Sequence, residues 1–300
     1  MMNINDYIQM AAKDLIRKLN AGVPLCQCNT LTFKGEQLPD YNDAVLQDLY
    51  ILRYGMAYAY EYKKLYKTMM DEMDVIRMTD VIWFGNKLEV VSFGCGTMID
   101  YWALKRVFSE KAQIIYHGVD VVDWNNKVPA CQEDVVKFHK QTASEYLASC
   151  EKLTADAYVF PKSISELDDE EIEAICNVWR EKNIENEEVS LLFAMRSTDG
   201  NMLSDFKKAE KLCGALSSVG MTCTNTTIVD GVREKVYNLD EDFAEDIWWN
   251  VYNMLKNLPI MCKKYTSSLC NCNLCRENRN LPIGYNSYMK LKVFTFRKAA

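Results

Sequence analysis

The sequence predicts an α/β fold in which helices cover a doubly wound parallel sheet. The apolar residues 88–93 run into Gly94-Cys95-Gly96 and then into a helical pattern, which indicates a buried strand, a tight turn and a helix. Short β-branched or aromatic runs then alternate with stretches of helical length as far as residue 219. Strands that alternate with helices in this way form parallel sheets. A length of 300 residues suits one large domain or one domain with additions.

Residues 1–84 are predicted to form an N-terminal helical cap. Apolar side chains recur at helical spacing over residues 3–20, and Asn20-Ala21-Gly22 ends this helix. A long helical pattern rich in tyrosine runs from about residue 41 to about residue 73. The pattern changes near residue 85, so we place the second predicted domain at residues 85–300.

The second domain is predicted to contain the sheet. Five strands are expected at residues 88–93, 113–120, 134–139, 155–160 and 189–195. Helices are expected between them, near residues 97–109, 142–151, 169–182 and 203–219. Residues 222–229 and 288–296 alternate in the manner of strands and are expected to pair at the edge of the sheet. A helix at about residues 240–257 and a cysteine-rich insertion at about residues 258–285 separate these last two strands.

Composition limits the classes of function. Apolar residues make up 49% of the chain, which is ample for a core, and the net charge of -7 disfavours a protein that grips nucleic acid by charge alone. The first residues show no signal-peptide pattern, and no apolar run is long enough to span a membrane, so we expect a cytoplasmic protein. In that compartment the 12 cysteines are expected to be free thiols or metal ligands.

The glycine turn and Asp120 together predict a nucleoside site. The glycines let the backbone approach a ligand, the start of the following helix offers free N–H groups, and an acid at the end of the next strand accepts hydrogen bonds from ribose hydroxyls. The third glycine of a dinucleotide motif is replaced by Ile99, and no Gly-Lys-Ser/Thr follows as in a P-loop. A short turn followed by an acid favours S-adenosylmethionine.

Three segments resemble class I S-adenosylmethionine-dependent methyltransferases. Ser92-Phe93-Gly94-Cys95-Gly96-Thr97 resembles motif I, and Gly118-Val119-Asp120 resembles the acidic motif of the second strand. Residues 155–163 resemble the fourth-strand segment, which in the family faces the transferring methyl group. The resemblance covers roughly residues 85–220. It implies a Rossmann-like, seven-stranded methyltransferase sheet whose last two strands form an antiparallel hairpin.

Two positions depart from the family pattern. The family often has an acid where Ser92 stands and a third glycine where Met98 stands. The missing acid removes a usual contact with the amino group of the cofactor. Asp100 or a residue of the helical cap is the expected replacement.

The expected cofactor contacts lie at the carboxyl ends of the strands, where ligands of open α/β sheets bind. They are Gly94, Cys95, Gly96, Asp120, Val121, Gln141, Thr142, Phe160 and Pro161. Val121 is expected to pack near the adenine, and Gln141 and Thr142 are expected to bond to its edge. Asp123 is either a second acid near the ribose or a solvated loop residue.

The sequence assigns no definite catalytic residue. Methyl transfer from a sulfonium depends above all on positioning, so a general base is optional. The candidates are Lys162, on the loop after the fourth strand, and His139, at the end of the third. Lys162 is alternatively a solvated loop lysine, and His139 is alternatively a structural histidine. The segment around Phe160 lacks the Asn/Asp-Pro-Pro-Tyr/Phe pattern of enzymes that methylate amino groups of DNA bases.

Four cysteines of the insertion form a candidate metal site. They are Cys262, Cys270, Cys272 and Cys275. Four thiolates satisfy tetrahedral zinc and also hold an iron–sulfur cluster. The alternative is a set of free thiols, since cysteines are scattered through the rest of the chain.

The expected function is methyl transfer from S-adenosylmethionine. The net charge and the aromatic cap favour a small-molecule acceptor, whereas basic residues beside the cysteine cluster favour RNA. The alternative function is a non-catalytic protein that binds S-adenosylmethionine and metal, such as a ribosome-assembly-type factor.

Overall fold

A computed structural model describes most of the chain. The described residues are 3–23, 40–77, 87–108, 111–196, 199–230, 235, 242–258, 281–285 and 289–299. Contacts divide the chain into two compact units, which are considered separately. The helical unit comprises Met1–Tyr58, Val122–Val128 and Glu234–Asn286. The sheet unit comprises Ala59–Val121, Pro129–Arg233 and Ser287–Ala300. These contacts therefore divide the chain at several places other than the expected boundary near residue 85.

The helical unit is built from α1 (Ile4–Asn20), α8 (Glu245–Asn257) and the first half of α3 (Ala44–Arg77). Asn3 caps α1 because its side chain accepts the N–H of Asn5, and the apolar side of α1 is buried. No described helix is both long and apolar enough to cross a membrane.

The segment Val122–Val128 leaves the sheet after β2 and packs inside the helical unit. The Trp124 ring lies 5.1 Å from that of Tyr50 and 5.4 Å from that of Tyr41, measured between ring centroids. The side-chain oxygen of Gln47 accepts the N–H of Asn125 at 2.8 Å. Tyr50 of α3 and Tyr41, which precedes that helix, therefore pack against this segment.

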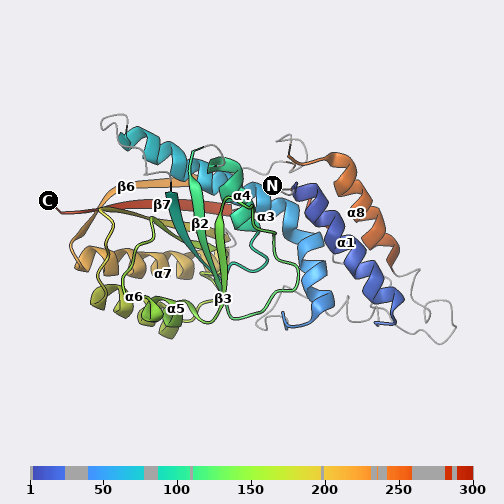
Figure 1. Cartoon of the computed structure of the whole chain (residues 1–300), viewed down its shortest axis with the longest axis horizontal. Helices are drawn as coiled ribbons and strands as arrows, with labels where there is room; N and C mark the ends of the chain where they lie inside the picture. The colour runs from blue at the N-terminus through green and yellow to red at the C-terminus, as the bar shows by residue number, and fades with distance from the viewer. Residues whose placement is uncertain are drawn as a thin grey trace. The chain divides into compact units, whose positions relative to one another are not determined.

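The sheet unit contains seven strands with helices between them (Figure 1). Its first elements are β1 (Lys87–Phe93), α4 (Ile99–Phe108), β2 (Gln113–Asp120), β3 (Val135–Lys140) and α5 (Ala143–Ser149). They are followed by β4 (Ala157–Pro161), α6 (Asp169–Glu181), β5 (Glu188–Arg196), α7 (Asp199–Ser218), β6 (Met221–Asp230) and β7 (Met289–Lys298). The predicted elements are confirmed in type and order.

The strand order is β3-β2-β1-β4-β5-β7-β6. The first five strands are parallel, and β7 runs antiparallel to both β5 and β6. The expected α/β, Rossmann-like sheet with a final antiparallel pair is thus confirmed. The last two strands pair at the edge of the sheet as expected, with β7 next to β5 and β6 outermost.

The main core lies between the sheet and helices α5, α6 and α7, which share one face in Figure 1. Phe93, Phe160 and Phe193 from three neighbouring strands pack there in contact with one another. Helix α4 covers the opposite face, where Tyr101 contacts Tyr116 of β2. Both faces of the sheet are therefore buried, as a parallel sheet requires.

Candidate functional site: the glycine turn at the carboxyl edge of the sheet

The turn between β1 and α4 fits glycine for two reasons. Gly94 and Gly96 have φ angles of +67° and +53°, which glycine adopts without the strain that other residues incur. A Cβ atom on Gly94 would also lie 2.4 Å from Cβ of Ser163, in the loop after β4. The N–H of Gly94 donates to the carbonyl of Val119 at 2.7 Å. The turn is thus held between the ends of β2 and β4.

Gly118 makes room for the same turn. A Cβ atom at this position would lie 2.8 Å from Sγ of Cys95. The thiol of Cys95 is buried against β2, so a side chain at position 118 would require the side chain of Cys95 to shift. The sequence placed Gly118 in a motif, but its steric role depends on packing that the sequence does not display.

Asp120 and the glycine turn are brought together as predicted. The N–H of Gly96 donates to the carboxylate of Asp120 at 2.8 Å, and the N–H of Gln141 donates to the carbonyl of the same residue at 3.1 Å. Val121 follows at the end of β2 with 60% of its surface exposed. An acid, two backbone donors and an exposed apolar side chain therefore meet at this edge of the sheet.

The remaining expected contacts lie at the same edge, but their side chains have structural roles. Thr142 caps α5, and its hydroxyl accepts the N–H of Glu145 at 3.2 Å. The ring of Phe160 is fully buried and stacks on Phe193, and its carbonyl accepts the N–H of Lys162 at 2.9 Å. The carbonyl of Pro161 accepts the hydroxyl of Tyr62 at 3.2 Å.

Met98 has a left-handed backbone conformation, which glycine adopts more readily than methionine. Its φ angle is +61°, and its side chain is 3% exposed. A left-handed conformation costs a residue with a side chain roughly 1–2 kcal/mol. The conformation at this position is thus one that suits glycine, and burial of the methionine side chain offsets the strain.

Two substitutions at Met98 separate strain from burial. Both Met98→Ala and Met98→Gly lose the buried side chain, but only the glycine variant relieves the left-handed strain. We expect Met98→Gly to have the higher free energy of unfolding, by about 1 kcal/mol. Chemical denaturation measures the difference. In an ordinary helix interior the order is reversed, so an alanine variant of equal or greater stability would contradict the strained geometry.

Asp100 lies inside the protein, beneath the turn. Its carboxylate is fully buried and accepts the hydroxyl of Tyr116 at 2.8 Å and that of Tyr66 at 3.3 Å. Burial raises the pKa of Asp100 to about 6, and the bond from Tyr116 lowers it only in part. Asp100 therefore supports the turn from below, which differs from the expected contact with the amino group of a cofactor.

Lys162 is buried and ion-paired, so the alternative of a solvated loop lysine was wrong. Its side chain is 5% exposed and pairs with Glu61 of α3, whose side chain is 1% exposed. Lys162 also has a φ angle of +64°. Sequence reasoning did not single out Glu61. The feature that could have indicated it is its place as an acid among the closely spaced tyrosines of a long helix.

His139 lies beside the other histidine of the chain. Its Nε2 atom is 3.1 Å from Nδ1 of His117, and Tyr146 of α5 packs on both rings. Burial lowers the pKa of His117 to about 4 and also lowers that of His139. Both histidines are therefore neutral at neutral pH, and the pair is packed under α5.

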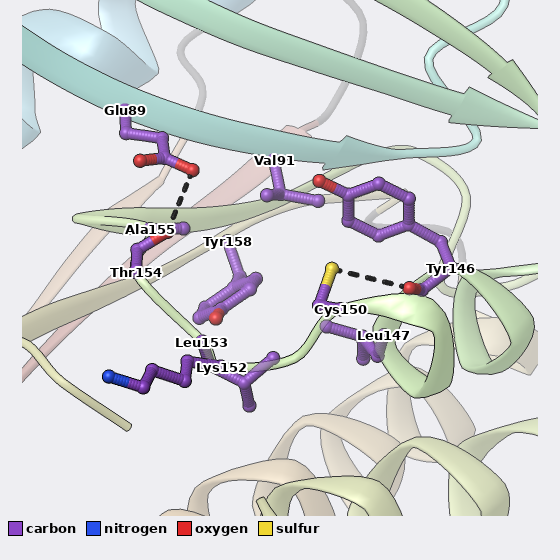
Figure 2. A pocket seen from close by; sticks show the side chains of 10 residues that line it. All are labelled: Glu89, Val91, Tyr146, Leu147, Cys150, Lys152, Leu153, Thr154, Ala155 and Tyr158. Atoms are coloured by element: carbon purple, nitrogen blue, oxygen red, sulfur yellow. Dashed lines mark hydrogen bonds between the residues drawn. The ribbon is translucent and has the colours of Figure 1, made fainter. Parts of the chain in front are cut away.

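One cavity lies at the opposite end of the strands (Figure 2). It is lined by Glu89 near the start of β1, by Cys150 after α5 and by residues that precede β4, and Glu89 accepts the hydroxyl of Thr154 at 3.0 Å. Its volume of about 20 Å³ leaves room for about one water molecule and is far below the roughly 300–1,000 Å³ of typical ligand pockets. We therefore place the candidate site at the glycine turn.

The predicted cysteine ligands Cys262, Cys270, Cys272 and Cys275 lie outside the described residues. Among the residues that the structure does describe, no group of three or more His, Cys, Asp or Glu side chains is placed to hold a metal ion. The zinc or iron–sulfur site stays a prediction.

Comparisons with protein families and with curated proteins find no match. Solved structures do show similarity. A methyltransferase that depends on S-adenosylmethionine, from Archaeoglobus fulgidus, is 16% identical with a TM-score of 0.38, over 76% of this chain and 94% of that one. The 1,6-didemethyltoxoflavin-N1-methyltransferase of Burkholderia thailandensis is 12% identical with a TM-score of 0.35, over 72% and 73%.

A geranyl diphosphate C-methyltransferase from Streptomyces coelicolor A3(2) is 11% identical with a TM-score of 0.32, over 78% of this chain and 80% of that one. Likeness at this level is distant, so the function of this chain has to be inferred from its own residues. The strand order of this chain and the hydrogen bond from its glycine turn to Asp120 are the observations from which that function is inferred.

Proposed function

We propose that this protein is an S-adenosylmethionine-dependent methyltransferase. The observation that carries the proposal is the hydrogen bond of 2.8 Å between the N–H of Gly96 and the carboxylate of Asp120. It joins a turn that excludes a side chain at Gly94 to an acid at the end of the adjacent strand. Such a pair fits a nucleoside, with the backbone close to the ligand and the acid on the ribose hydroxyls.

Each group of residues at the site would contact a different part of the cofactor. Asp120 would hold the ribose, the exposed side chain of Val121 would cover the adenine, and the backbone of the glycine turn would lie along the methionine part. Bound S-adenosylmethionine supplies an electrophilic methyl group on a sulfonium. The chain's own task is to hold that group in line with a nucleophile, and the loop after β4 is expected to face it.

The acceptor proposed first is a small molecule. The net charge of -7 provides no general attraction for phosphate backbones, so RNA is the second candidate. A protein that binds the cofactor without catalysis is the alternative class, and the departures at Ser92 and Met98 are compatible with it. Binding of cofactor without turnover on small molecules or RNA would support that alternative.

Calorimetric titration with S-adenosylmethionine and S-adenosylhomocysteine tests the proposal directly. We expect Asp120→Asn to weaken the binding of both by at least about tenfold, because the ribose loses a charged acceptor. Asp123→Asn is the matched control in the following loop. Asp123 pairs with Lys127 at 2.7 Å and is 62% exposed, so this change should alter affinity less than about twofold.

Failure of the unaltered protein to bind either compound at millimolar concentration would overturn the proposed function. Equal affinities of Asp120→Asn and the unaltered protein would reject the ribose role of Asp120. A large effect of Asp123→Asn would instead assign that acid to the ribose.

A further inference from the structure

The Lys162–Glu61 pair is an unfavourable arrangement by itself. Removing two charges from water is costly, and a buried ion pair is often no more stabilising than apolar residues of the same volume. The left-handed backbone of Lys162 adds a further cost, because its φ angle is +64°. Both partners are nearly inaccessible to solvent, at 5% and 1% exposure. Strain and buried charge thus coincide on one residue, which points to a role other than stability.

The loop that carries Lys162 is anchored on both sides. Before it, the carbonyl of Pro161 accepts the hydroxyl of Tyr62, one residue after Glu61 in α3. After it, the hydroxyl of Ser163 donates to the carbonyl of Phe93 at the end of β1. The N–H of Lys162 itself donates to the carbonyl of Ala194 in β5 at 3.1 Å. The pair therefore has a fixed position at the carboxyl edge of the sheet.

The same loop touches the cofactor turn. Cβ of Ser163 lies where a side chain on Gly94 would be, so Lys162 is one residue away from direct contact with the turn. Helix α3 reaches the other side of the turn through Tyr66, which bonds to Asp100. Opposite charges are thus held beside the place where the proposed function puts the sulfonium or, after transfer, the thioether.

We propose that the two charges of the Lys162–Glu61 pair act in opposite directions on the site: Glu61 favours the cationic sulfonium of S-adenosylmethionine, Lys162 favours the neutral thioether of S-adenosylhomocysteine, and their pairing sets the balance between the two affinities. The inference rests on the proposed function. The electrostatic energy of a unit charge falls with distance, and a nearby opposite charge cancels most of its effect. With both partners present, their effects on the positively charged sulfur nearly cancel. S-adenosylmethionine then binds without strong attraction or repulsion from the pair.

The test is the ratio of the two dissociation constants, measured by calorimetry at neutral pH. Lys162→Gln leaves the Glu61 carboxylate without the Lys162 charge. The affinity for S-adenosylmethionine relative to that for S-adenosylhomocysteine should therefore rise about fivefold. Glu61→Gln leaves the Lys162 ammonium without the Glu61 charge. The affinity for S-adenosylmethionine relative to that for S-adenosylhomocysteine should therefore fall about fivefold. Glutamine can hydrogen-bond to either partner, which favours folding of both variants.

A second buried pair in the sheet unit is the matched control. Lys105 of α4 bonds to Asp134 at 3.0 Å, and their side chains are 3% and 0% exposed. Lys105→Gln and Asp134→Asn should lower stability without moving the ratio. Lys162→Arg, which keeps the charge, should also leave it unchanged.

Opposite shifts in the two glutamine variants would support the inference, because a loss of packing alone does not distinguish a sulfonium from a thioether. Unchanged ratios, or shifts in the same direction, would overturn it while leaving the proposed function intact. If the unaltered protein binds neither compound, the proposed function itself has failed. Should either glutamine variant fail to fold, the double variant Lys162→Gln/Glu61→Lys places the positive charge on α3, and an unchanged ratio there would also overturn the inference.

Discussion

Replacing Gly94 with alanine is expected to destabilise the protein by about 3 kcal/mol and to abolish binding of S-adenosylmethionine. The new Cβ atom would have to occupy space 2.4 Å from Cβ of Ser163, and the φ angle of +67° is strained for alanine. Relief requires the turn to separate from the loop after β4, which would disrupt the cofactor cradle. Chemical denaturation and calorimetric titration measure the two effects.

Two other glycines of the sheet unit provide the controls. Gly220 has a φ angle of +85°, and a Cβ atom added there would have no neighbour within 4 Å, so Gly220→Ala should cost only the strain, about 1 kcal/mol. Gly214 lies within α7 with equally open space, and alanine there should stabilise the helix by up to about 1 kcal/mol. If Gly94→Ala were no more harmful than Gly220→Ala, the close approach at the turn would be refuted.

Asp100→Asn is expected to stabilise the protein increasingly as the pH rises from about 4 to about 7. Burial raises the pKa of Asp100 from 3.8 to about 6, so the native state binds the proton more tightly than the unfolded state. The contribution of this group to stability is therefore greatest below pH 4 and is lost as the pH rises through 6. One pKa unit corresponds to about 1.4 kcal/mol, which makes the total change about 3 kcal/mol.

The quantity to measure is the free energy of unfolding of Asp100→Asn minus that of the unaltered protein, at several pH values. Subtraction cancels the carboxylates that the two proteins share. Tyr116→Phe is the companion variant, because loss of a hydroxyl donor should raise the pKa of Asp100 further and destabilise the protein at neutral pH. A difference that does not change with pH would show that Asp100 is not a buried titrating group.

The elements of the sheet unit were predictable because their signals are local. Alternating strand and helix patterns, and the glycines that interrupt them, lie within a few residues of the structure that they determine. Asp120 and Gly96 were paired correctly because parallel strands bring their carboxyl ends to one edge.

The contacts between distant segments were not predictable in the same way. Glu61 and Lys162 are far apart in the sequence; Lys162 was a catalytic candidate or a solvated loop lysine, and Glu61 was not singled out at all. Asp100 was expected to face a cofactor, but the hydroxyls of Tyr66 and Tyr116 hold it below the turn. Packing of side chains on helix α3 decides both cases. Hydrophobic periodicity describes which side of a helix is buried, but it does not say which polar groups meet there.

Because Val122–Val128 belongs to the helical unit, that unit cannot be completed early in the synthesis of the chain. A nascent chain that has exposed only its first 58 residues lacks Trp124 and Asn126, and the latter accepts the hydroxyl of Tyr7 through its carbonyl. Helix α8 is made later still, and its start is tied to Asn5 through the carbonyl of Asp242 at 2.9 Å. All the packing partners of the amino-terminal helices are therefore present only after more than two hundred residues have emerged from the ribosome. A fragment that ends after these helices should not fold as an independent module.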